Sequence, residues 1–318
     1  MAKTLEGQSG YAWRSATASD AGRMRAENQD RAYADDELGV FLVVDGLGGH
    51  AAGEKAAETA VEAIRAAMLA GDGDLRNRIR GAIAAANNRI FEEAVANETW
   101  RGMACVLTLA MISDDKVIVG HVGDSRLYLM WNGALRKLTS DHSPVGERED
   151  RGELSEQEAM QHPRRHEVFR DVGSRRREPD DAEFVEMKEF LFKPDAAILL
   201  CSDGLSDLVT SAQMCEIIER YDGDPQKVAR DLVEAANFAG GKDNVTAVFV
   251  AGGEFLGHGS PEMAEARARH SITRARPGAI GADPAPTSRF RTFLTSRVAF
   301  LAYGFVIGVV LALVWKGP

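Results

Sequence analysis

The chain has 318 residues, of which 45% are hydrophobic and 27% are charged, and its formal net charge is −10. This balance excludes an intrinsically disordered chain and allows a sizeable core in one large domain or two ordinary ones. The charge is uneven, because residues 258–318 carry a net +5 and residues 1–257 therefore carry −15. An acidic body binds nucleic acid poorly, so we expect no nucleic-acid partner, but it can concentrate carboxylates around divalent cations.

The three cysteines, Cys105, Cys201 and Cys215, form no Cys-x-x-Cys pair. Their odd number and spacing argue against a disulfide framework or a zinc knuckle, and they fit a reducing compartment. Residues 1–10 contain no apolar run, so we expect no secretory signal peptide.

Seven short runs of β-branched, aliphatic or aromatic residues lie between turn signals, as strands do. In chain order they cover residues 40–44, 105–112, 117–122, 126–131, 184–187, 196–201 and 245–250. The dipeptide Asn132-Gly133 follows the fourth run and precedes the apolar residues Leu135 and Leu138. This pattern predicts a hairpin turn.

Three helices are expected between these strands. Residues 54–69 place apolar side chains on one face, and residues 75–96 carry a similar stripe. Residues 226–238 follow Pro225, which suits a first helical turn, and end before Gly240-Gly241. Because most strands follow one another while the helices are grouped elsewhere, we predict an α+β fold with antiparallel sheets.

The sequence changes character after residue 253, and residues 1–253 are predicted to form the catalytic domain. Residues 254–297 are rich in Gly, Pro, Ala and Arg, which predicts a flexible basic linker. Residues 298–315 contain no charge and would form a helix of about 27 Å, close to the roughly 30 Å of a bilayer core. Because arginines precede this run, we expect a single-pass transmembrane anchor with the domain in the cytoplasm, rather than a buried core helix.

Five acidic motifs stand at strand edges. Their aspartates are Asp30, Asp45, Asp124, Asp203 and Asp243. A lone Asp-Gly is a common turn, but several buried carboxylates need cations to offset their desolvation. Oxygen ligands without a His/Cys cluster favour Mg²⁺ or Mn²⁺, and two such ions about 3.5–4 Å apart can aim a hydroxide at phosphorus.

Taken together and in order, six motifs resemble those of the metal-dependent protein phosphatases, the type 2C serine/threonine phosphatases, in their bacterial form. The resemblance covers about residues 15–250. It is carried by Gly22-x-x-Arg25-x-x-Asn28-x-Asp30, Asp45-Gly46-x-Gly48-Gly49-His50, Gly123-Asp124-Ser125-Arg126, Leu138-Thr139-x-Asp141-His142-Ser143, Leu200-Cys201-Ser202-Asp203-Gly204-Leu205 and Gly241-Lys242-Asp243-Asn244-Val245-Thr246.

The resemblance implies a four-layer α-β-β-α sandwich of two antiparallel sheets flanked by helices. It also implies hydrolysis of phosphoserine and phosphothreonine by direct attack of metal-bound water at two Mn²⁺ or Mg²⁺ ions. By position, Asp45 resembles the carboxylate that bridges the two metals, and the Gly46 carbonyl resembles a ligand of one ion. Asp203 and Asp243 resemble the ligands of the other ion, and Asp30 resembles the residue that holds a metal-bound water.

Two further roles and two departures follow from the same resemblance. Asp124, with Asp203, resembles the site of a third, weaker ion, and Arg25 resembles the arginine that binds the phosphoryl oxygens with its forked guanidinium. Leu47 stands where eukaryotic members have a histidine thought to be a general acid. Gly102-Met103-Ala104 stands where the family has a Gly-Thr-Thr-like strand start.

Residues 147–180, here called the flap segment, correspond to the mobile flap of bacterial members. They are strongly charged and contain the run Arg175-Arg176-Arg177. A solvated loop is one interpretation, and a loop that selects phosphoprotein substrates is the other.

Phosphorylated proteins are the expected substrates, with a bacterial serine/threonine kinase as the opposing partner. The alternative is a catalytically weak, phosphoprotein-binding regulatory module on the same fold. The intact residues Asp30, Asp45, Asp203 and Asp243 argue against that module. A regulatory phosphatase of the anti-anti-sigma type is a third interpretation, which the predicted anchor makes less favoured.

Overall fold

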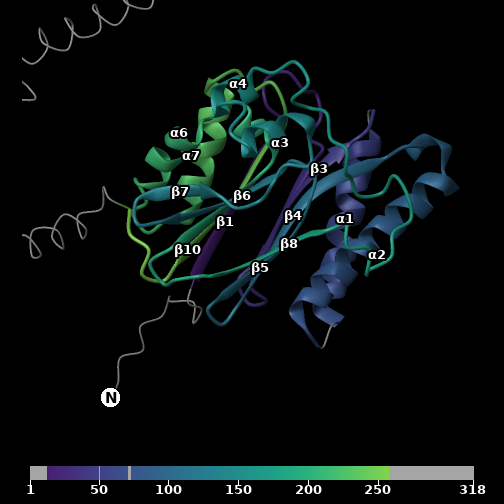
Figure 1. Ribbon diagram of the computed structural model, residues 1–318, viewed down its shortest axis with the longest axis horizontal. Helices are drawn as coiled ribbons and strands as arrows, with labels where there is room; N and C mark the ends of the chain where they lie inside the picture. Colours follow the sequence, from purple (N-terminus) through teal and green to yellow (C-terminus); the bar gives the residue numbers. More distant parts are fainter. Residues whose placement is uncertain (1–12, 50, 71–72, 258–318) are drawn as a thin grey trace, which may run out of the picture. The chain divides into compact units, whose positions relative to one another are not determined.

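A computed structural model describes residues 13–49, 51–70 and 73–257 (Figure 1). The strands of this part form two five-stranded sheets, ordered β1-β10-β9-β6-β7 and β2-β3-β4-β5-β8, and every pairing is antiparallel. The strands are β1 (Trp13–Asp20), β2 (Asp30–Asp35), β3 (Val40–Leu47), β4 (Ala104–Ser113), β5 (Lys116–Val122), β6 (Arg126–Trp131), β7 (Ala134–Lys137), β8 (Glu186–Leu191), β9 (Ala197–Cys201) and β10 (Val245–Gly252).

Helices cover the outer face of each sheet. The long pair α1 and α2 packs on the sheet that contains β3 and β4, and α6 and α7 pack on the sheet that contains β9 and β10 (Figure 1). The helices are α1 (Ala51–Ala70), α2 (Leu75–Ala96), α3 (Pro144–Asp150), α4 (Glu156–Met160), α5 (Asp203–Ser206), α6 (Ser211–Ile218) and α7 (Pro225–Phe238), with a 3₁₀ turn η1 (Glu98–Trp100). The predicted α-β-β-α sandwich is therefore confirmed for the described residues.

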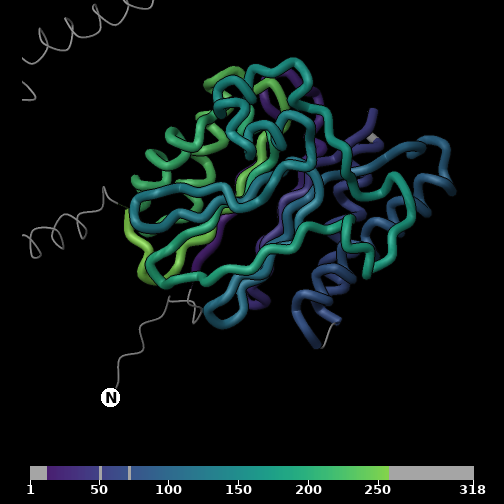
Figure 2. Tube along the Cα trace, in the orientation of Figure 1, coloured from purple at the N-terminus to yellow at the C-terminus, as the bar shows by residue number. Residues whose placement is uncertain are grey.

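The two sheets are joined by an apolar layer in which side chains from both inner faces meet. Phe41 and Val43 of β3 pack there with Leu127 of β6, Ile198 of β9 and Val248 of β10. Because alternate residues of a strand point to opposite faces, Leu42 and Val44 instead pack under α1 and α2. The trace in Figure 2 shows how segments far apart in sequence lie side by side, as β1 and β10 do.

Local signals explain the elements that sequence reasoning located best. The carboxylate of Asp74 accepts a hydrogen bond from the backbone N–H of Asn77, which caps the first turn of α2. Asn132 and Gly133 both have positive φ, at 52° and 71°, and they close the predicted hairpin between β6 and β7. A two-residue turn of this hand matches the twist of the strands that it joins.

Two predicted strands have other bounds in the structure. The strand expected at residues 184–187 is β8, which starts at Glu186, paired with His121, and runs on to Leu191, because Phe184 is a buried residue of the preceding turn. The run 40–44 does not end before Asp45, since β3 continues through Asp45 to Leu47. Strands β1 and β2 were not predicted, because their residues are polar or small and mostly half-buried.

No helix of the described part is both long and apolar enough to cross a bilayer. The predicted anchor, residues 298–315, lies outside the described residues. So does the predicted linker beyond Gly257.

Candidate active site

One edge of the β2–β3 pair brings two predicted site residues together. Asp30 opens β2 and is paired in register with Asp45 of β3. Asp30 is 2% exposed, and its Oδ1 atom is buried without a hydrogen-bond partner. A buried carboxylate oxygen of this kind calls for a cation or an ordered water.

The second sheet adds two more carboxylates at the same edge. Asp203 opens α5 directly after β9, and Asp243 lies two residues before β10. Ser202 connects the two sheets, since its hydroxyl donates to Asp30 Oδ2 at 2.7 Å and accepts from the Thr246 N–H at 3.0 Å. Asp203 Oδ1 is also buried without a hydrogen-bond partner, as Asp30 Oδ1 is.

The carboxylates repel one another electrostatically. Burial and the neighbouring charges of Asp30 and Asp203 raise the pKa of Asp45 well above its usual range. Burial, followed by the charge of Asp203, does the same to the pKa of Asp124. Burial raises the pKa of Asp30 to about 7, although the hydrogen bond from Ser202 works against it. Five aspartates therefore form one group, called here the acidic edge cluster: Asp30, Asp45, Asp124, Asp203 and Asp243.

The ligand atoms of this cluster suit divalent cations. Its donors are hard carboxylate oxygens, two of which have no hydrogen-bond partner, and burial and mutual repulsion raise the pKa of Asp30, Asp45 and Asp124. Cations placed among these oxygens would offset both the repulsion and the desolvation. Mg²⁺ and Mn²⁺ prefer such ligands.

Arg25 lies beside this group on an exposed loop. Its Nη2 atom is 2.8 Å from Asp243 Oδ2, and its side chain is 55% exposed. The loop is held in place because the N–H of Arg23 donates to the Gly241 carbonyl at 2.7 Å. Gly22 has φ of +78°, and a Cβ atom there would lie 2.2 Å from the Asp243 carbonyl oxygen. The Gly-x-x-Arg spacing thus lets the loop approach Asp243 closely enough for Arg25 to reach it.

Gly46 is required by close packing at the end of β3. A Cβ atom there would lie 2.1 Å from the carbonyl oxygen of Gly53 in α1. The Gly46 N–H donates to the Gln29 carbonyl at 3.2 Å. Its predicted role as a carbonyl ligand remains a prediction. Leu47, which stands at the position of the missing histidine, is half-buried at the end of the same strand.

Two acidic-site neighbours escaped sequence reasoning. Asp207 lies one helical turn after Asp203, and His166 of the flap segment places Nδ1 3.6 Å from Asp203 Oδ2 and 3.7 Å from Asp207 Oδ2. Burial and the charge of Asp203 raise the pKa of Asp207 to about 6. The spacing of four residues from Asp203 could have indicated Asp207. Nothing in the local sequence indicates His166, because the flap segment brings it there.

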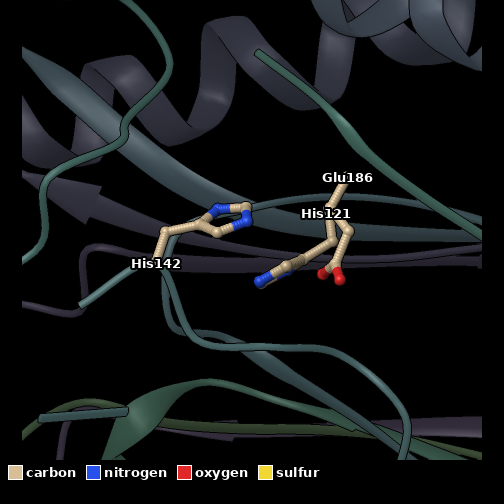
Figure 3. A group of neighbouring side chains, drawn as sticks. All are labelled: His121, His142 and Glu186. Carbon is tan, nitrogen blue, oxygen red and sulfur yellow. The ribbon is translucent and has the colours of Figure 1, made fainter. Parts of the chain in front are cut away.

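A second group of titratable side chains lies away from these carboxylates. His121, His142 and Glu186 approach one another in Figure 3. Protein groups already face the nitrogens of both rings: Thr108 and Ser140 contact His121, while Gly123 and Arg170 contact His142. This arrangement favours a hydrogen-bonded junction over a metal site.

The backbone of residues 175–177 is hydrogen-bonded to α2, although the side chains of Arg175 and Arg176 are exposed. Asn87 of α2 donates to the Arg175 carbonyl at 2.7 Å, and Asn88 both donates to the Arg177 carbonyl and accepts from its N–H. The Arg177 guanidinium stacks on Phe184, with 4.7 Å to the ring centroid. This end of the flap segment is therefore fastened to α2.

Comparison with known proteins agrees with this geometry. The family model described as "Protein phosphatase 2C" matches residues 22–234. The serine/threonine phosphatase stp of Listeria monocytogenes is 34% identical over 243 residues, which cover 73% of this chain and 93% of that protein. The chain belongs to the protein phosphatase 2C family.

Solved structures carry the same fold. The crystal structure of the Mycobacterium tuberculosis serine/threonine phosphatase PstP/Ppp is 32% identical, with a TM-score of 0.67, covering 75% of this chain and 98% of that one. A structure of the catalytic domain of PstP in complex with two manganese ions is 30% identical, with a TM-score of 0.66, covering 75% of this chain and 97% of that one.

Proposed function

We propose that this chain is a metal-dependent protein phosphatase that hydrolyses phosphoserine and phosphothreonine. The observation that carries the proposal is the acidic edge cluster, in which carboxylates from both sheets lie together and burial and mutual repulsion raise the pKa of Asp30, Asp45 and Asp124. Membership of the protein phosphatase 2C family supports it. So do the two manganese ions bound by the PstP catalytic domain.

The residues take the following roles in this proposal. Asp45 would be shared by two Mn²⁺ or Mg²⁺ ions, the Gly46 carbonyl would bind one of them, and Asp203 and Asp243 would bind the other. Asp30 would hold a water beside them, and its carboxylate is oriented by the 2.7 Å hydrogen bond from Ser202. When bound, the two cations lower the pKa of water and polarise the phosphoryl oxygens.

Two further residues extend this set. Asp124 and Asp203 hold a third, weaker ion, for which Asp207 and His166 are additional candidate neighbours. Arg25 binds the phosphoryl group, because its exposed guanidinium offers several N–H donors at the mouth of the cluster. Its pairing with Asp243 keeps the guanidinium close to the position that the phosphate would take.

The direct test is phosphate release by the full chain from a phosphothreonine peptide and from p-nitrophenyl phosphate. We expect hydrolysis with Mn²⁺ or Mg²⁺ and none with excess EDTA. A folded chain that releases no phosphate with any divalent metal would contradict the proposal. Retained binding of the phosphopeptide in that case would favour the regulatory binding module instead.

We also propose that residues 298–315 anchor the chain in a membrane, with the phosphatase domain in the cytoplasm opposing a serine/threonine kinase. The support is the uncharged run itself and the arginines before it. The full chain should sediment with membranes and resist carbonate extraction. Val309→Arg should release it, whereas Val309→Leu should not. Release of the unaltered chain by carbonate would contradict the anchor.

A further inference from the structure

His142 lies where the flap segment returns to the sandwich. Its backbone N–H donates to the Gly123 carbonyl at 2.7 Å, and its own carbonyl accepts from the Phe169 N–H at 3.0 Å. It is 6% exposed, and its ring lies 4.8 Å from that of His121 between centroids (Figure 3). His142 is therefore in contact with both the turn that carries Asp124 and the end of the flap segment.

The two ring nitrogens of His142 face two hydrogen-bond donors. The Gly123 N–H points at Nδ1 at 2.9 Å, and the Arg170 guanidinium places Nη1 3.0 Å from Nε2. Backbone N–H groups and guanidinium groups can only donate, whereas a neutral imidazole has a single accepting nitrogen. One of the two contacts must therefore go without its hydrogen bond at any moment.

Protonation does not relieve this conflict, because an imidazolium accepts at neither nitrogen. Burial, with the positive charge of Arg170 among its neighbours, lowers the pKa of His142 to about 2. The ring therefore stays neutral and has two tautomers. With the proton on Nε2 it accepts from Gly123, and with the proton on Nδ1 it accepts from Arg170.

We propose that His142 is a positioning residue for Asp124, and that Arg170 of the flap segment selects its tautomer. When Arg170 engages Nε2, the Gly123 N–H loses its acceptor and the turn before Asp124 is held less firmly. When Arg170 withdraws, His142 accepts from Gly123 and fixes that turn. The consequence for metal binding rests on the proposed function, because it assumes that Asp124 holds a cation.

Besides the ring of His142, the Arg170 guanidinium has carboxylates among its neighbours. Burial lowers the pKa of the Arg170 guanidinium, and the charges of Glu183 and Glu186 act against this effect. The Glu186 carboxylate already accepts from the Ser140 N–H and pairs with Lys188. Rotation of the Arg170 side chain can thus move the guanidinium from the neutral ring towards carboxylates, while Phe169 and Val172 on either side stay hydrogen-bonded to His142 and Cys105.

The first experiment measures the tautomer directly. The full chain, which has seven histidines, is labelled with ¹⁵N in its histidine rings, and His142 is assigned by difference from His142→Gln. Ring-nitrogen shifts of the metal-free unaltered chain should report both tautomers. Arg170→Met should move the proton to Nε2, and Arg170→Lys, which keeps a donor, should restore the pattern of the unaltered chain. Arg176→Met is the matched control, because Arg176 pairs with Glu92 on the surface.

Identical His142 shifts in the unaltered chain and in Arg170→Met would overturn the proposal. The second experiment titrates the same variants with Mg²⁺. We expect the weakest Mg²⁺ site to tighten on the order of threefold to tenfold in Arg170→Met and to stay unchanged in Arg176→Met. A tautomer shift without any change in Mg²⁺ affinity would overturn the link to Asp124. Absence of all Mg²⁺ binding would instead contradict the proposed function, while the tautomer result would still decide the role of Arg170.

Discussion

Two groups of buried charges lie within a few residues of each other and behave oppositely. In the first, which we call the Arg126 network, Arg126 Nη2 lies 2.6 Å from Asp141 and 2.8 Å from Glu149, and Lys137 adds a second cation. The second is the acidic edge cluster, to which Asp124 belongs. The first supplies its own cations, whereas in the second Arg25 pairs with Asp243 and the remaining carboxylates are expected to bind divalent cations from solution.

The pKa values express this difference. Although burial raises it, the charges of Arg126 and Lys137 hold the pKa of Asp141 below its usual value. Burial and the charge of Asp203 raise the pKa of Asp124, and the charge of Arg126 acts in the other direction. Removing one partner of a balanced buried group leaves an unpaired charge and destabilises the fold, whereas an unbalanced group is a candidate ligand site. Substitutions in the two groups should therefore have different effects.

Asp45→Asn should cause the largest loss, and that loss should be in activity. The substitution removes the charge that both cations would share, so phosphate release should fall by roughly 10²–10⁴-fold while folding in the absence of metal is kept or improved. The measurement is kcat on a phosphothreonine peptide at saturating Mn²⁺. Asp114→Asn, in an exposed turn, is the matched control. Activity of Asp45→Asn within threefold of that of the unaltered chain would contradict a role of Asp45 in the hydrolysis.

Arg126→Met should cost stability instead. It leaves Asp141 and Glu149 buried without their main partner, so the free energy of unfolding should fall by about 3–5 kcal/mol. Urea denaturation of the metal-free chain measures this change. Arg136→Met, at an exposed position on β7, should change it by less than about 0.5 kcal/mol. A loss as small for Arg126 as for Arg136 would contradict the contrast between the two groups.

The metal-free chain should become less stable as the pH rises from about 4 to about 7. The pKa of Asp30 is about 7 in the folded chain and 3.8 is its ordinary value, so ionisation in this window favours the unfolded state. The loss for this group should be at most about 4 kcal/mol. Thermal unfolding in EDTA across this range, compared with Asp30→Asn, isolates the contribution. A pH profile that Asp30→Asn leaves unaltered would count against it.

Ser202→Ala should have the smallest of these effects. It removes the donor to Asp30 Oδ2 and the acceptor for the Thr246 N–H, which should lower the free energy of unfolding by about 1–3 kcal/mol. Ser174→Ala, on the surface, is the control. Equal stability of both variants would show that the two sheets are held at this edge without Ser202.

The contrast also explains what could be predicted from sequence. Helix α2 and strand β6 were located to the residue, because Asp74 caps the former and Asn132-Gly133 ends the latter. The aspartates of the cluster were recognisable because each stands beside a strand in an ordered set of motifs. These signals are local, because they depend on residues that are close together in the sequence and not on contacts between distant segments.

The features that the sequence did not predict depend on contacts between segments that are distant in the sequence. His166 approaches Asp203 and Asp207 only because the flap segment folds back over α5. Strand β2 has a polar sequence and becomes a strand through its pairing with β3. The donors on both sides of His142 come from residues 19 and 28 positions away. Spacing within one segment cannot reveal such arrangements.

The central claim is that the acidic edge cluster takes its cations from solution. Calorimetric titration of the metal-free full chain with Mn²⁺ near pH 7.5, beside Asp203→Asn and Asp114→Asn, tests it most directly. We predict at least two Mn²⁺ ions per chain for the unaltered protein and for Asp114→Asn, and loss or strong weakening of at least one site in Asp203→Asn. Equal stoichiometry and affinity in all three proteins would contradict the claim.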